Sequence, residues 1–164
     1  MRPADLAAVL RGFHRAKLGM RERHVAVARH VGGYNFNNTY QYVIAREDTH
    51  LQWLEAAMAE EGATPDVVPP PEVPAPGRKG SVTPLVEEDA RSAAAFVAAW
   101  RPRVAVLTHA RHRTLLRLLL GETTEHQRFF EQIVAGREDV LGRRANGPGS
   151  PGTGDGVLGV RWIE

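Results

Sequence analysis

The uneven placement of proline constrains this chain more than any other feature of its sequence. Of the eleven prolines, seven fall between Pro65 and Pro84, in the segment TPDVVPPPEVPAPGRKGSVTP. Proline fixes φ and lacks a backbone N–H, so this stretch is typical of an extended connection and not of a helix or a central strand. We therefore expect two folded blocks joined by a long crossover, over residues 62–84.

Apolar residues recur at helical spacing in the first block, residues 4–61. One long amphipathic helix is expected to end at the pair Gly32-Gly33. A second helix, capped by Asn38 or Thr39, is expected to run to Gly62. Two long helices with a short turn predict an antiparallel hairpin.

The second block begins with a cap-plus-proline signal at Thr83-Pro84. Pro102 is expected to kink or end the helix that starts there. A last helix is expected to begin between Thr108 and Thr114 and to end near Gly136. Since no stretch alternates convincingly with period two, the sequence predicts an all-α fold. Its architecture is an antiparallel four-helix bundle built from two helical hairpins joined by the proline-rich crossover, which occupies residues 1–141.

Composition excludes several classes of protein. The 164 residues include no cysteine, so disulfide scaffolds, thiolate metal sites and cysteine nucleophiles are excluded, and any metal must be held by His, Asp and Glu. A net charge of +2 is too balanced for an electrostatic nucleic-acid binder. No apolar run approaches the roughly 20 residues of a membrane span. We expect a cytoplasmic protein with no nucleic-acid or membrane partner.

Ionisable residues on the core-facing stripes are the candidate site. Glu47 and His50 form Glu-x-x-His (EDTH) on one face of the second expected helix, so both can reach the same metal ions. His126, with Glu122 at its flank, faces the core from the last helix. On the first helix His24 faces the core, whereas Glu22 falls roughly opposite the stripe at a similar height.

The remaining histidines and the third expected helix supply weaker candidates for metal ligands. His14, His30, His109 and His112 fit surface or turn positions better, although His112 could enter the inner face of the last helix. The middle of the third helix carries no comparable titratable residue. The two blocks also look like an ancient repeat, because EDTHLQWLE aligns with TTEHQRFFE when His50 is set on His126. Glu47 then meets Thr123.

At IAREDTHLQWLEAAMAEEGA the chain resembles the ferritin-like, rubrerythrin-type superfamily, whose second helix carries E-x-x-H followed by an aromatic-leucine pair. The resemblance implies a four-helix bundle that binds two iron or manganese ions through four carboxylates and two histidines. Glu47 and His50 match this pattern and would be the catalytic pair, and His126 matches the second histidine. Glu122 is a displaced substitute, and Glu22 is shifted.

Two forms of metal site remain open. A dinuclear centre could be completed across a homodimer or higher homo-oligomer. Alternatively, three imidazoles and two carboxylates could hold a single iron, manganese or zinc ion; these residues are His24, Glu47, His50, Glu122 and His126. A buried Glu–Arg or Glu–His network without metal is the alternative for Glu122 and His126.

The C-terminal segment supplies a second resemblance. After a Gly/Pro-rich linker at residues 142–156, the segment GDGVLGVRWIE is similar to the peptides that load ferritin-like proteins into encapsulin shells. This predicts docking of residues 157–164 on an encapsulin shell protein, and hence a place inside an encapsulin nanocompartment. The function expected from the sequence is iron binding or oxidation, as a ferroxidase or peroxide-linked oxidoreductase carried as encapsulin cargo. The alternative is a non-catalytic ferritin-like scaffold or interaction protein.

Overall fold

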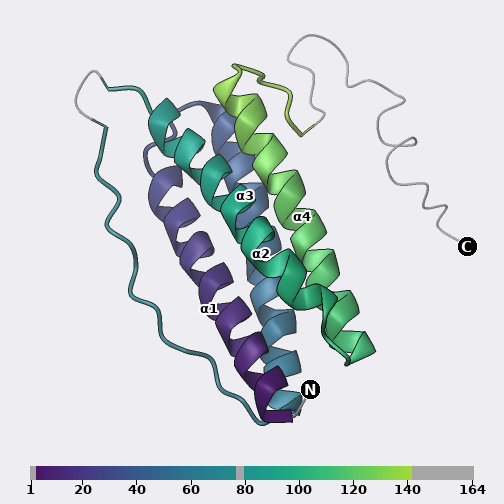
Figure 1. Cartoon of the computed structure of the whole chain (residues 1–164). Helices are drawn as coiled ribbons and strands as arrows, with labels where there is room; N and C mark the ends of the chain where they lie inside the picture. The colour runs from purple at the N-terminus through teal and green to yellow at the C-terminus, as the bar shows by residue number, and fades with distance from the viewer. Residues whose placement is uncertain (1–2, 77–79, 142–164) are drawn as a thin grey trace, which may run out of the picture.

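The computed structural model describes residues 3–76 and 80–141, which form four helices (Figure 1). They are α1 (Pro3–Ala28), α2 (Tyr34–Glu60), α3 (Thr83–Ala105) and α4 (Ala110–Val134). No strand occurs within these described ranges. The predicted all-α fold with four helices is therefore confirmed. The expected linker, residues 142–156, and the expected docking peptide, residues 157–164, lie outside the described residues.

The start of α2 differs from the prediction. The helix begins at Tyr34, and Gly33, in an extended conformation, is its N-cap. The prediction that Asn38 or Thr39 caps this helix is wrong, because the helix starts four residues earlier and both residues lie inside it. The Asn37 side chain donates hydrogen bonds to the carbonyls of Ala28 and Val31, and so ties the start of α2 to the end of α1.

Glycines end two helices as the sequence predicts. Gly62 follows α2 with φ +67° and Gly136 follows α4 with φ +78°, the left-handed conformation that glycine adopts without strain. Pro102, by contrast, does not end α3, which continues to Ala105. Proline lacks only its own N–H, so Pro102 removes one intrahelical hydrogen bond, and the helix continues for three residues beyond it.

Ion pairs show how the helices lie beside one another. From α1 to α2, His14 faces Glu55 and Arg21 faces Asp48, so the contacts run in opposite order along the two helices. Helix α1 packs mainly on α2, and α3 mainly on α4. Figure 1 shows residues 61–76, which follow α2, passing along the outside of the bundle from one end to the other.

The apolar interior is divided into two clusters. One contains Phe13, Leu54, Trp100 and Leu116, with Phe13 in edge contact with Trp100. The other contains Val27, Tyr40, Val43, Val86 and Phe130. On α2 the polar residues Glu47 and His50 fall between the two clusters, and on α4 Thr123 and His126 do the same. The bundle therefore holds a layer of buried polar side chains between two apolar layers.

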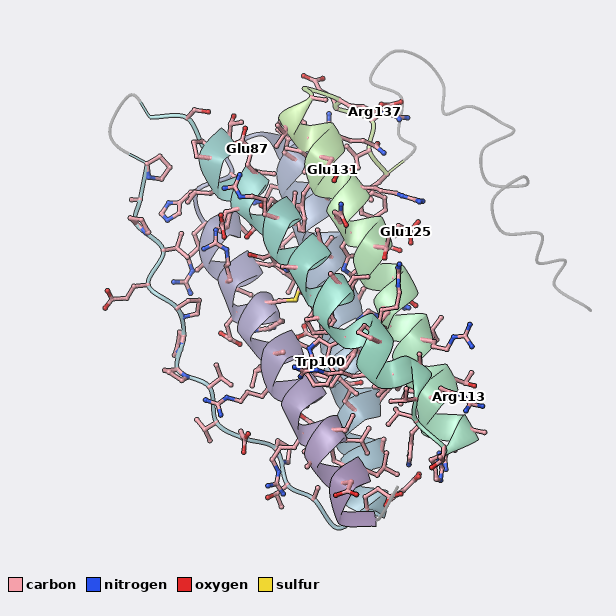
Figure 2. All side chains as sticks on the ribbon, viewed as in Figure 1. Glu87, Trp100, Arg113, Glu125, Glu131 and Arg137 are labelled. Carbon is pink, nitrogen blue, oxygen red and sulfur yellow. The ribbon has the colours of Figure 1, made fainter. Side chains whose placement is uncertain are left out.

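Charge on the outside of the bundle follows the usual amphipathic pattern. Figure 2 shows Glu125 and Glu131 on the outer side of α4, whereas Trp100 of α3 is buried in the interior. In the described part of the chain, no helix combines the length and apolar character that a membrane span requires.

Candidate functional site

A buried lysine lies at the centre of the polar layer. Lys17 and Glu47 are both 0% exposed, and the Lys17 Nζ donates to Glu47 Oε1 at 2.9 Å. The same ammonium donates to Thr123 Oγ1 at 3.1 Å and lies 5.8 Å from the centre of the Phe96 ring. One side chain of α1 thus contacts α2, α3 and α4.

Glu47 uses both carboxylate oxygens. Oε1 accepts from Lys17, and Oε2 lies 2.7 Å from the buried Nδ1 of His24. Burial by itself raises the pKa of Glu47, but the neighbouring His24 and Lys17 outweigh it and hold this pKa far below its usual range. Glu47 is therefore ionised, and its charge is balanced within the protein.

Glu122 forms a second pair at the edge of the layer. The Arg46 guanidinium donates to both oxygens of Glu122, at 2.7 Å for each of the shortest contacts, and His50 Nε2 lies 2.7 Å from Oε2. Burial raises the pKa of Glu122, but the hydrogen bonds from Arg46 and His50 outweigh this effect. The pKa of Glu122 therefore lies below its usual value. Because Glu122 is partly exposed, this pair connects the layer to the surface.

His126 and His50 stack on each other, with 6.0 Å between ring centroids and 12° between planes. Burial and then the positive charge of Lys17 lower the pKa of His126 to about 3. The pKa of His50 is lowered for the same two reasons, against the opposing effect of Glu122. Nδ1 of each ring is buried without a hydrogen-bond partner. Near neutral pH we infer that both imidazoles are uncharged.

Asp89 on α3 is a third interior carboxylate, and it too pairs with a basic side chain. It is fully buried, accepts from Arg23 at 2.7 Å and accepts from the Tyr40 hydroxyl at 2.6 Å. Burial, followed by the charge of Asp89, raises the pKa of Tyr40 well above its usual range, so the phenol stays protonated and donates. Each of Glu47, Asp89 and Glu122 is thus bonded to one lysine or arginine.

The predicted ligands lie in pairs. His24 contacts Glu47, His50 contacts Glu122, and His126 stacks on His50. Glu22 lies outside this layer, in an ion pair with Arg21 on the partly exposed side of α1. Within residues 3–76 and 80–141, the close group of three side chains able to hold a metal ion is Glu61, His109 and His112, none of which was predicted. Metal binding by the predicted residues stays a prediction.

Sequence reasoning missed Lys17, Asp89 and the burial of two histidines. Lys17 lies three residues before Met20 and seven before His24, so helical spacing puts it on the buried stripe of α1, but this spacing does not show whether the ammonium is buried. The surface positions favoured for His14 and His112 are wrong, because both side chains are buried, and His112 lies on the inner face of α4 that was its alternative. Each faces a glutamate toward the end of α2, His14 at 3.3 Å from Glu55 and His112 at 3.2 Å from Glu61.

Comparison with known proteins finds no family model, no curated protein and no solved structure that matches this chain.

Removal of the buried cation tests the importance of the Lys17–Glu47 pair. We expect Lys17→Met to lower the free energy of unfolding by about 3–5 kcal/mol, because Glu47 is left buried without the ammonium that balances its charge. Adding Glu47→Gln should recover part of this loss, since a neutral amide needs no cation. Urea unfolding at neutral pH measures both. Arg91→Met, which breaks an exposed pair with Glu88, is the control and should cost about 0–1 kcal/mol. A Lys17→Met protein as stable as this control would contradict the assignment.

The lowered pKa of His126 predicts acid sensitivity. Below pH 6.5 the unfolded chain takes up a proton on this imidazole, whereas the folded protein does not until its pKa of about 3. Stability therefore falls as the pH falls through this window, and between pH 7 and pH 5 the loss attributable to His126 is on the order of 2 kcal/mol. His126→Gln should reduce the difference in unfolding free energy between these pH values by that amount. Gln52→Ala, which changes an exposed side chain of α2 without a titratable group, should leave it unchanged. Equal pH dependence in the His126 variant and wild type would show that His126 titrates normally.

Proposed function

We propose that this chain is a ferritin-like four-helix bundle in which an internal ion pair replaces the metal centre, and that it acts as a structural or interaction protein. The observation that carries this proposal is Lys17. Its ammonium is bonded to Glu47, the residue that matches the bridging or chelating carboxylate in the ferritin-like pattern. The course of residues 61–76 along the bundle after α2 supports the ferritin-like connectivity (Figure 1).

The interior residues do not fit the dinuclear iron or manganese centre that the resemblance implies. Such a centre uses carboxylates from all four helices. Here the interior carboxylates Glu47, Asp89 and Glu122 are already bonded to Lys17, Arg23 and Arg46. Binding two divalent ions would require these three cations to leave, or would place like charges together in a region of low dielectric.

A mononuclear site at the stacked histidines is the second candidate. It is favoured by the unpartnered Nδ1 atoms of His50 and His126, because a buried imidazole nitrogen without a partner is rare. The lowered pKa of His126 also keeps its ring in the neutral form that binds metal. The nearby charge of Lys17 opposes a second cation at this position, and for that reason we favour the metal-independent bundle.

Metal analysis separates the two candidates. We expect protein expressed without a polyhistidine tag, in medium supplemented with iron or manganese, to contain less than about a tenth of an equivalent of either metal, because Lys17 already neutralises Glu47. Elemental analysis of the purified protein measures this. We also expect Fe²⁺ oxidation in its presence to be no faster than in buffer.

Variants identify the source of any metal that is found. Glu47→Gln and His126→Gln alter the interior layer, and Glu125→Gln is a matched change on the exposed side of α4. One iron or manganese per chain that is lost in the first two variants and kept in the third would overturn the metal-independent proposal and establish the mononuclear site.

Loading into an encapsulin shell is proposed from the sequence of residues 157–164. The support is the order of apolar residues in GVLGVRWIE after a Gly/Pro-rich linker, since alternate apolar side chains anchor an extended peptide in a groove. This proposal is independent of the interior layer, because a scaffold and a metalloprotein could use the same loading peptide.

Deletion of residues 157–164 tests this role. When the full-length chain is co-expressed with an encapsulin shell protein, we expect it to co-purify with the assembled shell and the deleted chain to remain outside. The melting temperatures of the two chains should agree, because a segment that docks on a partner contributes nothing to the isolated bundle. A clearly lower melting temperature for the deleted chain, with no loading of either, would show that the segment docks on its own bundle.

A further inference from the structure

We propose that the end of the bundle holds a binding site for a zinc-class divalent ion, formed by Glu61, His109 and His112. This site lies outside the polar layer and goes beyond the proposed function. Glu61 is the C-cap residue of α2, His109 is the N-cap residue of α4, and His112 lies in the first turn of α4. Each offers a ligand atom, and these atoms all lie within 4.8 Å of one another.

His112 is the buried ligand of the proposed site. Its side chain is 1% exposed, and Nε2 lies 3.2 Å from Glu61 Oε1. Its other ring nitrogen, Nδ1, is buried without a hydrogen-bond partner. The nitrogen that faces Glu61 is Nε2, so an ion shared with Glu61 would bind His112 through Nε2 and replace the contact between these two side chains.

His109 is poised to join His112. The two rings stack with 4.2 Å between centroids. The Nδ1 of His109 accepts from the backbone N–H of His112 at 3.4 Å, which is long for a hydrogen bond. This bond can therefore be exchanged for a metal bond at little cost. His109 is exposed, so the remaining coordination positions are open to water.

The charge around Glu61 differs from that in the polar layer. The two nearest arginines in sequence on α4 are already engaged, Arg111 with Glu60 and Arg113 with the Leu107 carbonyl. Among the described residues, no lysine or arginine pairs with Glu61, whereas each interior carboxylate carries one. A divalent cation would supply the missing positive charge.

The donor set selects the kind of metal. Two imidazoles and one carboxylate, with open positions for water, are typical of zinc sites and suit Co²⁺, Ni²⁺ and Cu²⁺ as well. Calcium and magnesium prefer all-oxygen sites. A bound ion would join the end of α2 to the start of α4, so it would stabilise the folded state by mass action.

Titration with Co²⁺ and Zn²⁺ tests this proposal. The full chain, without a polyhistidine tag and treated with chelator, is titrated with Co²⁺ and followed by its visible absorption. Zn²⁺ then displaces the Co²⁺. We expect one Co²⁺ per chain, loss of its absorption on adding Zn²⁺, and a higher melting temperature with Zn²⁺ than without.

Two variants remove ligands while preserving the local structure. His109→Ser keeps an N-cap side chain for α4, and Glu61→Gln keeps the shape of the carboxylate. Each is expected to raise the Co²⁺ dissociation constant at least about tenfold. Glu60→Gln, one residue away and paired with Arg111, is the matched control and should bind Co²⁺ as wild type does.

Glu47→Gln separates this proposal from the interior candidates. Unchanged Co²⁺ binding in this variant, together with the loss in His109→Ser and Glu61→Gln, supports the end site and leaves the proposed function intact. The proposal is overturned if no Co²⁺ binds, or if both ligand variants bind it as tightly as wild type. Binding that is lost only in Glu47→Gln would overturn both proposals.

Discussion

The buried ion pair between Lys17 and Glu47 is the interaction on which the interior depends. Removing an ammonium from water is costly, and it is tolerated only where a carboxylate and further acceptors replace its hydration. Glu47 and Thr123 provide that replacement from two other helices. Because either charge alone would be strongly destabilising, this pair restricts how α1, α2 and α4 can be positioned along one another.

The same requirement explains the rest of the polar layer. Glu122 and Asp89 each take an arginine, so the interior carries balanced charge. Burial, followed by the positive charge of Lys17, lowers the pKa of His126 and of His50, which keeps the stacked rings uncharged. The layer is therefore a set of neutralised groups between two apolar clusters. At the end of the bundle Glu61 faces two histidines, and among the described residues no lysine or arginine pairs with it. The charge of Glu61 is therefore not balanced in the way that the interior carboxylates are.

Much of the fold could be predicted from the sequence. Helical periodicity located the four helices, and Gly62 and Gly136 marked two of their ends, because glycine adopts the left-handed conformation that terminates a helix. The same periodicity placed His24, Glu47, His50 and His126 toward the core, and all four are buried. Lys17 has the same helical spacing but was not predicted, because a lysine on an apolar stripe often extends its amine to solvent and the pattern does not say whether the charge is buried.

The sequence by itself determined which residues form helices and which of their faces are buried, since both depend on neighbours within a few positions. Only the tertiary structure decided how the buried charges are satisfied. Lys17 meets Glu47 across 30 positions of the chain and Thr123 across 106. The tertiary structure likewise brings His109 and His112 to Glu61. No periodic pattern in the sequence connects these three residues. The helical pattern is repeated locally, whereas the partner of a buried charge is set by packing between helices distant in sequence, and that packing determines whether an acidic residue meets a lysine, an arginine or an imidazole.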